Sequence, residues 1–215
     1  MRGTAGRSPS WIARRRAPAT IVRQYQRAKA LRDFGASLGP EAAHHIAVGA
    51  ETLALRMDRI CDNAQAIAQY LQKHPKVAWV NYAGLSDHPE HALVQKYMNG
   101  KASGIVSFGL KSQDSDKRAA GARFLDALGL FTRLVNIGDA KSLATHPAST
   151  THRQLDAAEL AKAGVSEDMV RLSVGIEHIE ARTAKRVVTT GCGQGTVFGD
   201  VMAGLDTIVL PDAAT

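Results

Sequence analysis

The sequence of 215 residues is long enough for one well-packed domain, and 45% apolar and 22% charged residues are ordinary for a globular protein. No run approaches the roughly eighteen uninterrupted apolar residues that a membrane-spanning helix needs, so we expect no membrane segment. Cys61 and Cys192 are too few and too far apart in sequence to suggest a disulfide framework or a zinc site. A reducing compartment, the cytoplasm, is therefore expected.

The net charge of +7 is unevenly distributed along the chain. Residues 1–32 carry eight arginines and one lysine without an acidic residue, whereas residues 33–215 hold 18 basic and 20 acidic side chains, a net charge of −2. A basic leader over residues 1–30 has three interpretations: an organelle transit peptide, a nucleic-acid-binding arm, or a disordered segment without a role. The near-neutral body offers no basic face, which argues against a nucleic-acid partner.

The first half of the body alternates between helical and strand-like periods. Apolar residues at spacings of three and four predict a long amphipathic helix over residues 41–74, which Pro75 ends. Period-two patterns predict strands at residues 77–82 and 104–110. A short helix is expected between these strands, over residues 88–98.

The second half continues the same alternation. We expect, in chain order, a helix, two strands, a helix and a strand, at residues 114–128, 131–137, 142–146, 156–163 and 169–174. The element order predicts an α/β (α+β) fold, in which a small sheet of four to five strands is covered by helices on one face. The glycines of residues 191–199 weakly resemble a phosphate cradle but lack the dinucleotide-binding spacing, so we expect an unstructured or poorly packed tail there.

The eight histidines do not suggest a metal centre. His44 and His45 point in different directions on a helix. His88 and His91 lack an acidic or cysteine partner at ligand spacing. We therefore interpret the histidines as ordinary polar side chains and expect no metal site.

Arg171 is the side chain whose position most needs an explanation. It lies in the centre of an otherwise apolar strand, where an arginine is costly to bury unless it meets an anion. Its planar guanidinium fits a ligand carboxylate in bidentate geometry. An ion pair with Glu177 or Asp139 explains the residue equally well, so the spacing alone leaves both interpretations open.

Several separated runs resemble one enzyme family. The runs G-D-A-K-S-L-A-T-H-P-A-S-T-T-H from Gly138 and V-R-L-S-V-G-I-E from Val170 resemble the C-terminal signature of cystathionine γ-synthase-like enzymes, which depend on pyridoxal 5'-phosphate (PLP). The runs E-T-L-A-L-R-M-D-R-I from Glu51 and H-P-K-V-A-W-V-N-Y-A-G-L from His74 resemble the O-acetylhomoserine sulfhydrylase branch. The resemblance covers residues 31–180, about 150 of the 215.

The resemblance implies a fold and a set of site residues. The fold is the C-terminal domain of fold-type I PLP enzymes, a small and mostly antiparallel sheet covered by helices on one face and preceded by a long helix. Arg171 is implied to bind the α-carboxylate of the amino-acid substrate, Asn136 to lie beside that carboxylate, and Thr151 to lie close to the substrate pocket. The implied partners are a large PLP domain and a second subunit, because the family's active site lies at their junction.

The resemblance also implies a reaction, in which O-acetylhomoserine and sulfide give homocysteine and acetate with PLP as the cofactor. The family's Schiff-base lysine lies in the large domain, in a Ser-x-Thr-Lys-type context that this sequence does not contain. We therefore assign no catalytic residue and expect the chain to be inactive alone. Lys141, near the signature, is interpreted as a solvated side chain.

The resemblance fades between Gly39 and Gly49 and again after Glu180, which suggests a gene fragment with unrelated sequence at its edges. The expected organisation is a basic leader (1–30), a PLP-transferase C-terminal domain (31–180) and an atypical glycine-containing tail (181–215). Two alternatives of other classes are a non-catalytic interaction domain that pairs with a PLP domain, and a nucleic-acid binder acting through the leader. The sequence does not distinguish an acetyl from a succinyl ester, or sulfide from cysteine as the nucleophile.

Overall fold

The structure is a computed structural model, and it describes residues 37–111, 117–179 and 196–209 together with a few single residues between 25 and 35. The chain divides into two units, residues 1–51 and 52–215. In the first unit, the helix α3 (Pro40–Glu51) has no buried residue. The basic leader lies almost entirely outside the described residues, so its three interpretations stay predictions.

A five-stranded sheet organises the second unit. Its strands are β1 (Val77–Asn81), β2 (Ile105–Leu110), β3 (Thr132–Arg133), β4 (Leu143–Thr145) and β5 (Met169–Ser173). The spatial order is β1-β2-β5-β4-β3, and every neighbouring pair is antiparallel except the parallel pair β3 and β4. β5 is therefore the central strand. The predicted α/β (α+β) fold with a mostly antiparallel sheet is confirmed.

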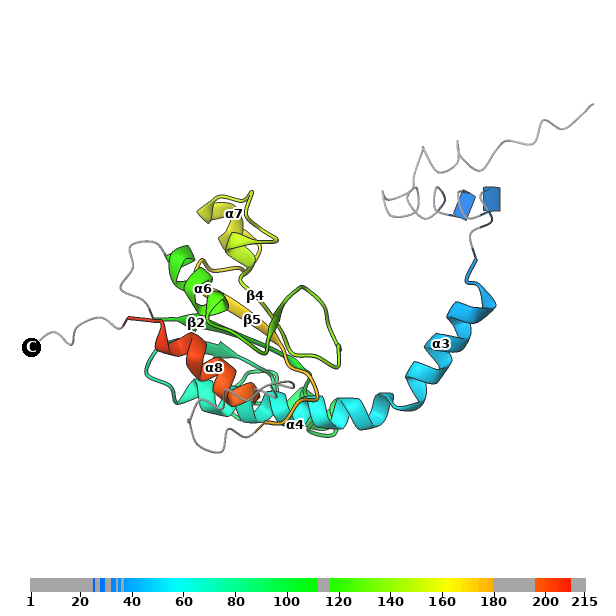
Figure 1. Cartoon of the computed structure of the whole chain (residues 1–215), viewed down its shortest axis with the longest axis horizontal. Helices are drawn as coiled ribbons and strands as arrows, with labels where there is room; N and C mark the ends of the chain where they lie inside the picture. The colour runs from blue at the N-terminus through cyan, green and yellow to red at the C-terminus, as the bar shows by residue number, and fades with distance from the viewer. Residues whose placement is uncertain are drawn as a thin grey trace, which may run out of the picture. The chain divides into compact units, whose positions relative to one another are not determined.

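Helices cover one face of this sheet. They are α4 (Leu53–Gln72), α6 (Lys117–Asp126) and α8 (Val197–Asp206), and Figure 1 shows α4 and α8 on the same side of the strands. Phe108 of β2 meets Phe124 of α6 edge to face, with 5.5 Å between the ring centroids. Ile67 of α4 and Val201 of α8 join the same buried cluster. The core thus lies between the sheet and these three helices.

Two side chains tie the ends of strands to their surroundings. Asn63 of α4 is buried, and its amide donates hydrogen bonds to the carbonyl oxygens of Gly175 and Glu177, each at 2.9 Å. These bonds hold the chain directly after β5. Before β2, the hydroxyl of Tyr82 donates to the carbonyl oxygen of Ser103 at 2.9 Å, and burial raises the pKa of Tyr82 to about 12.

Most predicted elements are present, with shorter bounds. The expected helix 41–74 is two helices, α3 and α4, that meet at Thr52. The expected helices 88–98 and 156–163 are α5 (His91–Met98) and α7 (Ala157–Lys162). A capping box between Asp156 and Glu159 begins α7, because each side chain accepts a hydrogen bond from the other residue's backbone N–H.

The expected strand 131–137 is wrong for most of its length. Only Thr132 and Arg133 pair with β4, and the chain then leaves the sheet. The side chain of Asn136 accepts a hydrogen bond from the N–H of Ile137 at 2.9 Å, and Gly138 turns the chain with φ at 78°. Such local bonds compete with strand pairing.

The expectation of an unpacked tail is wrong for residues 196–209. Thr196 caps α8 by accepting a hydrogen bond from the N–H of Gly199 at 3.3 Å. Val197, Val201 and Leu205 recur every four residues and are fully buried, which places α8 in the core. The glycine run at 191–195, and with it the weak phosphate-cradle pattern, lies outside the described residues.

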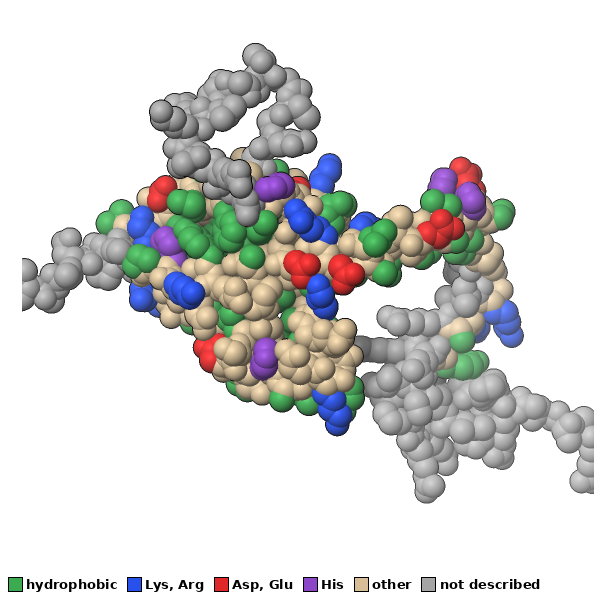
Figure 2. All heavy atoms as spheres, turned by 90° about the horizontal axis from the view of Figure 1, so that it is seen from below, with side chains coloured by type: hydrophobic (Ala, Val, Ile, Leu, Met, Phe, Trp, Pro, Cys, Tyr) green, Lys and Arg blue, Asp and Glu red, His purple; other side chains and the backbone are tan. Residues whose placement is uncertain are grey.

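None of the described helices is long and apolar enough to cross a membrane. On the face of the second unit seen in Figure 2, Lys and Arg side chains are scattered among acidic and apolar ones. The nucleic-acid alternative depends on the leader, which falls outside the described part of the chain.

Asp200 fastens α8 to the loop before β3, and replacing it should weaken the fold. Its two carboxylate oxygens accept hydrogen bonds from the backbone N–H groups of Gly129 at 2.5 Å and Phe131 at 2.8 Å. Asp200→Asn retains only one acceptor oxygen and leaves one buried N–H unpaired, so we expect urea denaturation to give a free energy of unfolding lower by about 1–3 kcal/mol. The exposed Asp206→Asn on the same helix is the matched control, and an equal loss in both variants would contradict the role of Asp200.

Candidate functional site

Arg171 projects from the face of the sheet that the three core helices leave uncovered. Along β5 the side chains alternate, and Val170 and Leu172 are fully buried in the core. Arg171 therefore points to the opposite face, where it is half-buried. Its neighbours across the sheet are Ser107 on β2 and Thr145 on β4.

The guanidinium of Arg171 has no hydrogen bond or ion pair within the part of the chain that the structure describes. The carboxylate of Glu177 instead accepts from the backbone N–H and the hydroxyl of Ser142, at 2.7 and 2.8 Å. Asp139 accepts from the backbone N–H of Lys141 at 3.0 Å. The ion-pair explanation of Arg171 is thus wrong for both acids that the sequence suggested.

A small hollow brings Arg171 and Asn136 together. It is lined by residues of β4, β5 and the segment that follows β3, namely Leu134, Val135, Asn136, Leu143, Thr145, Arg171 and Ser173. The hollow is too narrow to hold a water molecule. A ligand carboxylate can therefore enter this hollow only if the residues that line it move apart.

Ser173 is a site residue that the sequence interpretation did not identify. It is the next side chain after Arg171 on the same face of β5, it is 4% exposed, and it lines the same hollow. Its buried hydroxyl has no hydrogen-bond partner among the residues that the structure describes. Because buried polar groups are almost always paired, an unpaired hydroxyl beside an unpaired arginine is a feature of a ligand site. The period of two along the predicted strand was the signal that could have identified it.

Thr151 is not among the residues that line the hollow. It is exposed, and its hydroxyl forms a 2.8 Å hydrogen bond with Nδ1 of His152. Its proximity to a substrate stays a prediction. The preceding residue, Thr150, is the one that meets the sheet, through a 3.1 Å hydrogen bond between its hydroxyl and that of Thr145.

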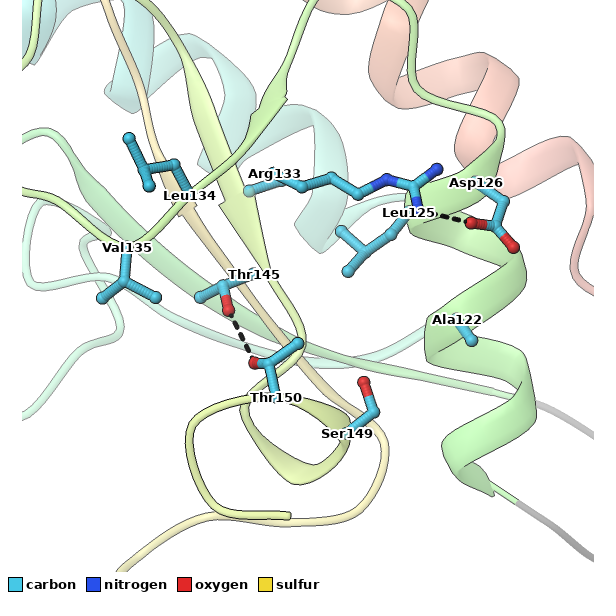
Figure 3. Close-up of a pocket in the computed structure, with 10 residues that line it drawn as sticks. Ala122, Leu125, Asp126, Arg133, Leu134, Val135, Thr145, Ser149 and Thr150 are labelled. Atoms are coloured by element: carbon cyan, nitrogen blue, oxygen red, sulfur yellow. Dashed lines mark hydrogen bonds and ion pairs between the residues drawn. The ribbon is translucent and has the colours of Figure 1, made fainter.

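A larger pocket of about 380 Å³ adjoins the hollow (Figure 3). Its lining comes from α6, β3 and its continuation, β4 and the 3₁₀ turn η1 (Pro147–Ser149): Ala122, Leu125, Asp126, Arg133, Leu134, Val135, Ala144, Thr145, Ser149 and Thr150. Three of these residues, Leu134, Val135 and Thr145, also line the hollow. The two cavities therefore share a wall.

His146 is buried and holds the turn η1 in place. Its Nε2 lies 2.8 Å from the carbonyl oxygen of Glu167, so Nε2 carries the proton. Its Nδ1 forms a 2.8 Å hydrogen bond with the hydroxyl of Ser149. A Cβ at Gly121 of α6 would collide with the imidazole ring, which explains a glycine inside this helix. His146 thus has a structural role, and no cluster of metal-binding side chains exists among the described residues.

Comparison with known proteins identifies the family. The sequence model of the Cys/Met metabolism PLP-dependent enzymes matches residues 17–183. The chain belongs to this family. Its members depend on pyridoxal phosphate, and the family membership predicted from the sequence motifs is confirmed.

Two relatives show which members of the family the chain resembles. The chain is 49% identical over 154 residues to O-acetyl-L-homoserine sulfhydrylase 1 of Thermus thermophilus, covering 72% of this chain and 36% of that protein. It is 50% identical over 154 residues to an L-methionine gamma-lyase of Pseudomonas deceptionensis, covering 71% and 37%. The chain thus spans just over a third of the length of these curated relatives.

A solved structure agrees with this likeness. A Campylobacter jejuni crystal structure described as an O-acetylhomoserine (thiol)-lyase has a TM-score of 0.67 and 36% identity, and the match covers 82% of this chain and 38% of that one. That protein carries a pyridoxyl-lysine-phosphate group.

The residues around the two cavities do not fit PLP itself. The cofactor needs a lysine for its aldehyde and an anion cradle for its phosphate. No lysine lines either cavity in the described part of the chain, and Lys141 is exposed, as predicted. Lys101 is paired with Asp62, and Lys76 donates to the carbonyl oxygen of Leu205 at 3.1 Å. The donors at the hollow, one guanidinium and one buried hydroxyl, instead match a carboxylate in their chemistry.

The unpaired hydroxyl of Ser173 predicts an unusual stability effect. Ser173→Ala removes a buried donor that has no partner, so urea denaturation should give a free energy of unfolding unchanged or higher by up to about 1 kcal/mol. Ser142→Ala is the matched control, because the Ser142 hydroxyl donates to Glu177 and accepts from the N–H of Gly175 at 2.9 Å. That control should lose about 1–3 kcal/mol. A comparable loss in Ser173→Ala would show that its hydroxyl is paired in solution.

Proposed function

We propose that this chain forms the carboxylate-binding part of the active site of a PLP-dependent O-acetylhomoserine sulfhydrylase. The observation that carries the proposal is the half-buried guanidinium of Arg171, which has no anionic partner within the described residues. A charge in such a position is costly unless an anion completes it. The α-carboxylate of an amino-acid substrate is an anion of the right geometry.

The neighbours of Arg171 support this role. Ser173 offers a second donor on the same strand face, and Asn136 brings an amide to the rim of the same hollow. A guanidinium with added hydroxyl and amide donors orients a carboxylate more tightly than a point charge does. Orientation is the contribution that a binding domain makes to catalysis, because it fixes the rest of the substrate relative to the reactive group.

In the proposed reaction, O-acetylhomoserine and sulfide give homocysteine and acetate. Pyridoxal phosphate stabilises the carbanions of such a reaction when it is bound, and we assign the cofactor and its lysine to a PLP domain outside the described residues. The relatives include a sulfhydrylase and a methionine lyase, and both names denote enzymes that act on amino acids. Carboxylate binding by Arg171 would serve either activity. We choose the sulfhydrylase because residues 51–60 and 74–85 resemble the sulfhydrylase branch of the family.

We propose that a large PLP domain, or a second subunit that carries one, covers the face around the hollow. Leu134, Val135 and Ile137 expose 53%, 47% and 70% of their surface there. Three apolar side chains on one short segment are a feature of a contact surface. Such a contact would also reach the hollow, because Leu134 and Val135 line it.

Arg171→Met should remove carboxylate binding without unfolding the chain. NMR titration of the full chain with O-acetyl-L-homoserine should show shifts at β5 and β4 that Arg171→Met weakens at least about tenfold, and Arg171→Lys should weaken them less because it keeps the charge. The α-carboxamide of the same ligand should bind neither protein. Lys141→Met is the control for a lost surface charge, and unchanged affinity in Arg171→Met would refute the proposal.

The chain alone should form no stable adduct with pyridoxal phosphate. After incubation with the cofactor, borohydride reduction and dialysis, mass spectrometry should find no stoichiometric modification of any one lysine, because no described lysine lines the hollow or the adjoining pocket. A full-length relative treated in parallel is the positive control. One lysine labelled in full would overturn the assignment of the cofactor to another domain.

A further inference from the structure

The pocket beside the Arg171 hollow has no part in the proposed carboxylate binding. It encloses about 380 Å³, which lies within the range of small-molecule sites. Two apolar walls face each other across it, with Ala122 and Leu125 of α6 on one side and Leu134 and Val135 on the other (Figure 3). Apolar walls of this kind suit an aliphatic chain.

An ion pair lies at one end of the pocket. Nη1 of Arg133 is 2.7 Å from Oδ1 of Asp126, and the two side chains are 56% and 64% exposed. Among the described residues, the guanidinium of Arg133 makes only this one contact. Its remaining N–H donors are therefore available to a ligand. The pair presents a positive and a negative group side by side at the same end of the pocket.

Three hydroxyl groups lie at the other end of the pocket, and each already donates its proton in a hydrogen bond within the protein. Thr150 donates to the carbonyl oxygen of His146 at 2.9 Å, so Thr145 must donate to Thr150. Ser149 uses its one proton for His146, either at Nδ1 (2.8 Å) or at the carbonyl oxygen (3.3 Å). All three hydroxyls can therefore only accept further hydrogen bonds. A ligand carboxylate finds free donors at the Arg133 end alone.

We propose that this pocket binds a zwitterionic α-amino acid with an aliphatic side chain. The carboxylate would pair with Arg133, and the α-ammonium with Asp126, so that both charges of the ion pair gain a partner. The aliphatic side chain would lie between the Leu125 and Val135 walls. Thr145 lines both cavities, so this ligand would lie next to the hollow without contacting Arg171.

The competing ligand classes fit less well. A phosphate or a dicarboxylate would place a second negative charge against Asp126 or against hydroxyls that have no free proton. A neutral apolar ligand would leave the ion pair without a new partner. An ω-amino acid, with its ammonium at the hydroxyl end, uses the acceptors there but leaves Asp126 unmatched.

The test is NMR titration of the full chain with L-norleucine, followed at the backbone amides of Ala122, Ser149 and Thr150. The isomer 6-aminohexanoate has the same atoms with the ammonium at the far end, and hexanoate lacks the ammonium. We expect norleucine to bind at least about tenfold more tightly than either compound. Equal or tighter binding of 6-aminohexanoate would overturn the assignment of the ammonium to Asp126.

Variants separate this pocket from the hollow. Arg133→Met should weaken norleucine binding at these amides at least about tenfold, and Asp126→Asn should shift the preference from norleucine toward hexanoate because Arg133 then has no internal carboxylate. Both side chains are more than half exposed, so neither change should unfold the chain. Arg171→Met should leave binding at this pocket unchanged. If Arg171→Met abolished norleucine binding and Arg133→Met retained it, the second site would be refuted and the proposed function would stand. An absence of norleucine binding at these amides would also refute the second site.

Discussion

The alternation of side chains along the central strand β5 is the constraint on which the site depends. β5 is paired on both edges, so its register cannot slip without breaking two ladders. Val170 and Leu172 are fully buried in the core, and this burial forces Arg171 to the opposite face. The hydrophobic free energy of two core residues thereby holds a guanidinium where it gains nothing from the fold itself.

The hydrogen bonds of the nearby acids complete this arrangement. Glu177 could have neutralised Arg171, but its carboxylate binds both the N–H and the hydroxyl of Ser142, and Asn63 holds its backbone. These contacts join the segments after β3 and after β5, so a single network stabilises the strand ends and withholds the acid from the arginine. A structural ion pair would have made Arg171 a stabilising residue. Because the described residues contain no such ion pair, the guanidinium of Arg171 is available to an anion from outside them.

Most of the secondary structure could be predicted from the sequence, because it depends on local periodicity. Arg171 could be named as a candidate binding residue for the same reason, since the period placed it inside an apolar strand. The partner of Glu177 could not be predicted, since Ser142 lies 35 residues away and meets it only through the register of β4 and β5. For the tail, the spacing of Val197, Val201 and Leu205 was a readable helical signal, which the preceding glycines obscured. The family motif placed Thr151 near the substrate, but the contact of Thr150 with Thr145 depends on the turn η1, which periodicity does not describe.

The wall shared by the two cavities links their chemistry. Leu134, Val135 and Thr145 face both, and the segment after Arg133 leaves the sheet because β3 is only two residues long. A longer β3 would have bonded this segment to β4 and fixed it in place, whereas an exposed segment held by few strand bonds can shift at low cost. Any ligand or domain that contacts this segment would therefore also contact residues that line the Arg171 hollow. The shortness of β3, which the periodicity did not predict, thus leaves the shared wall of the two cavities without strand pairing beyond Arg133.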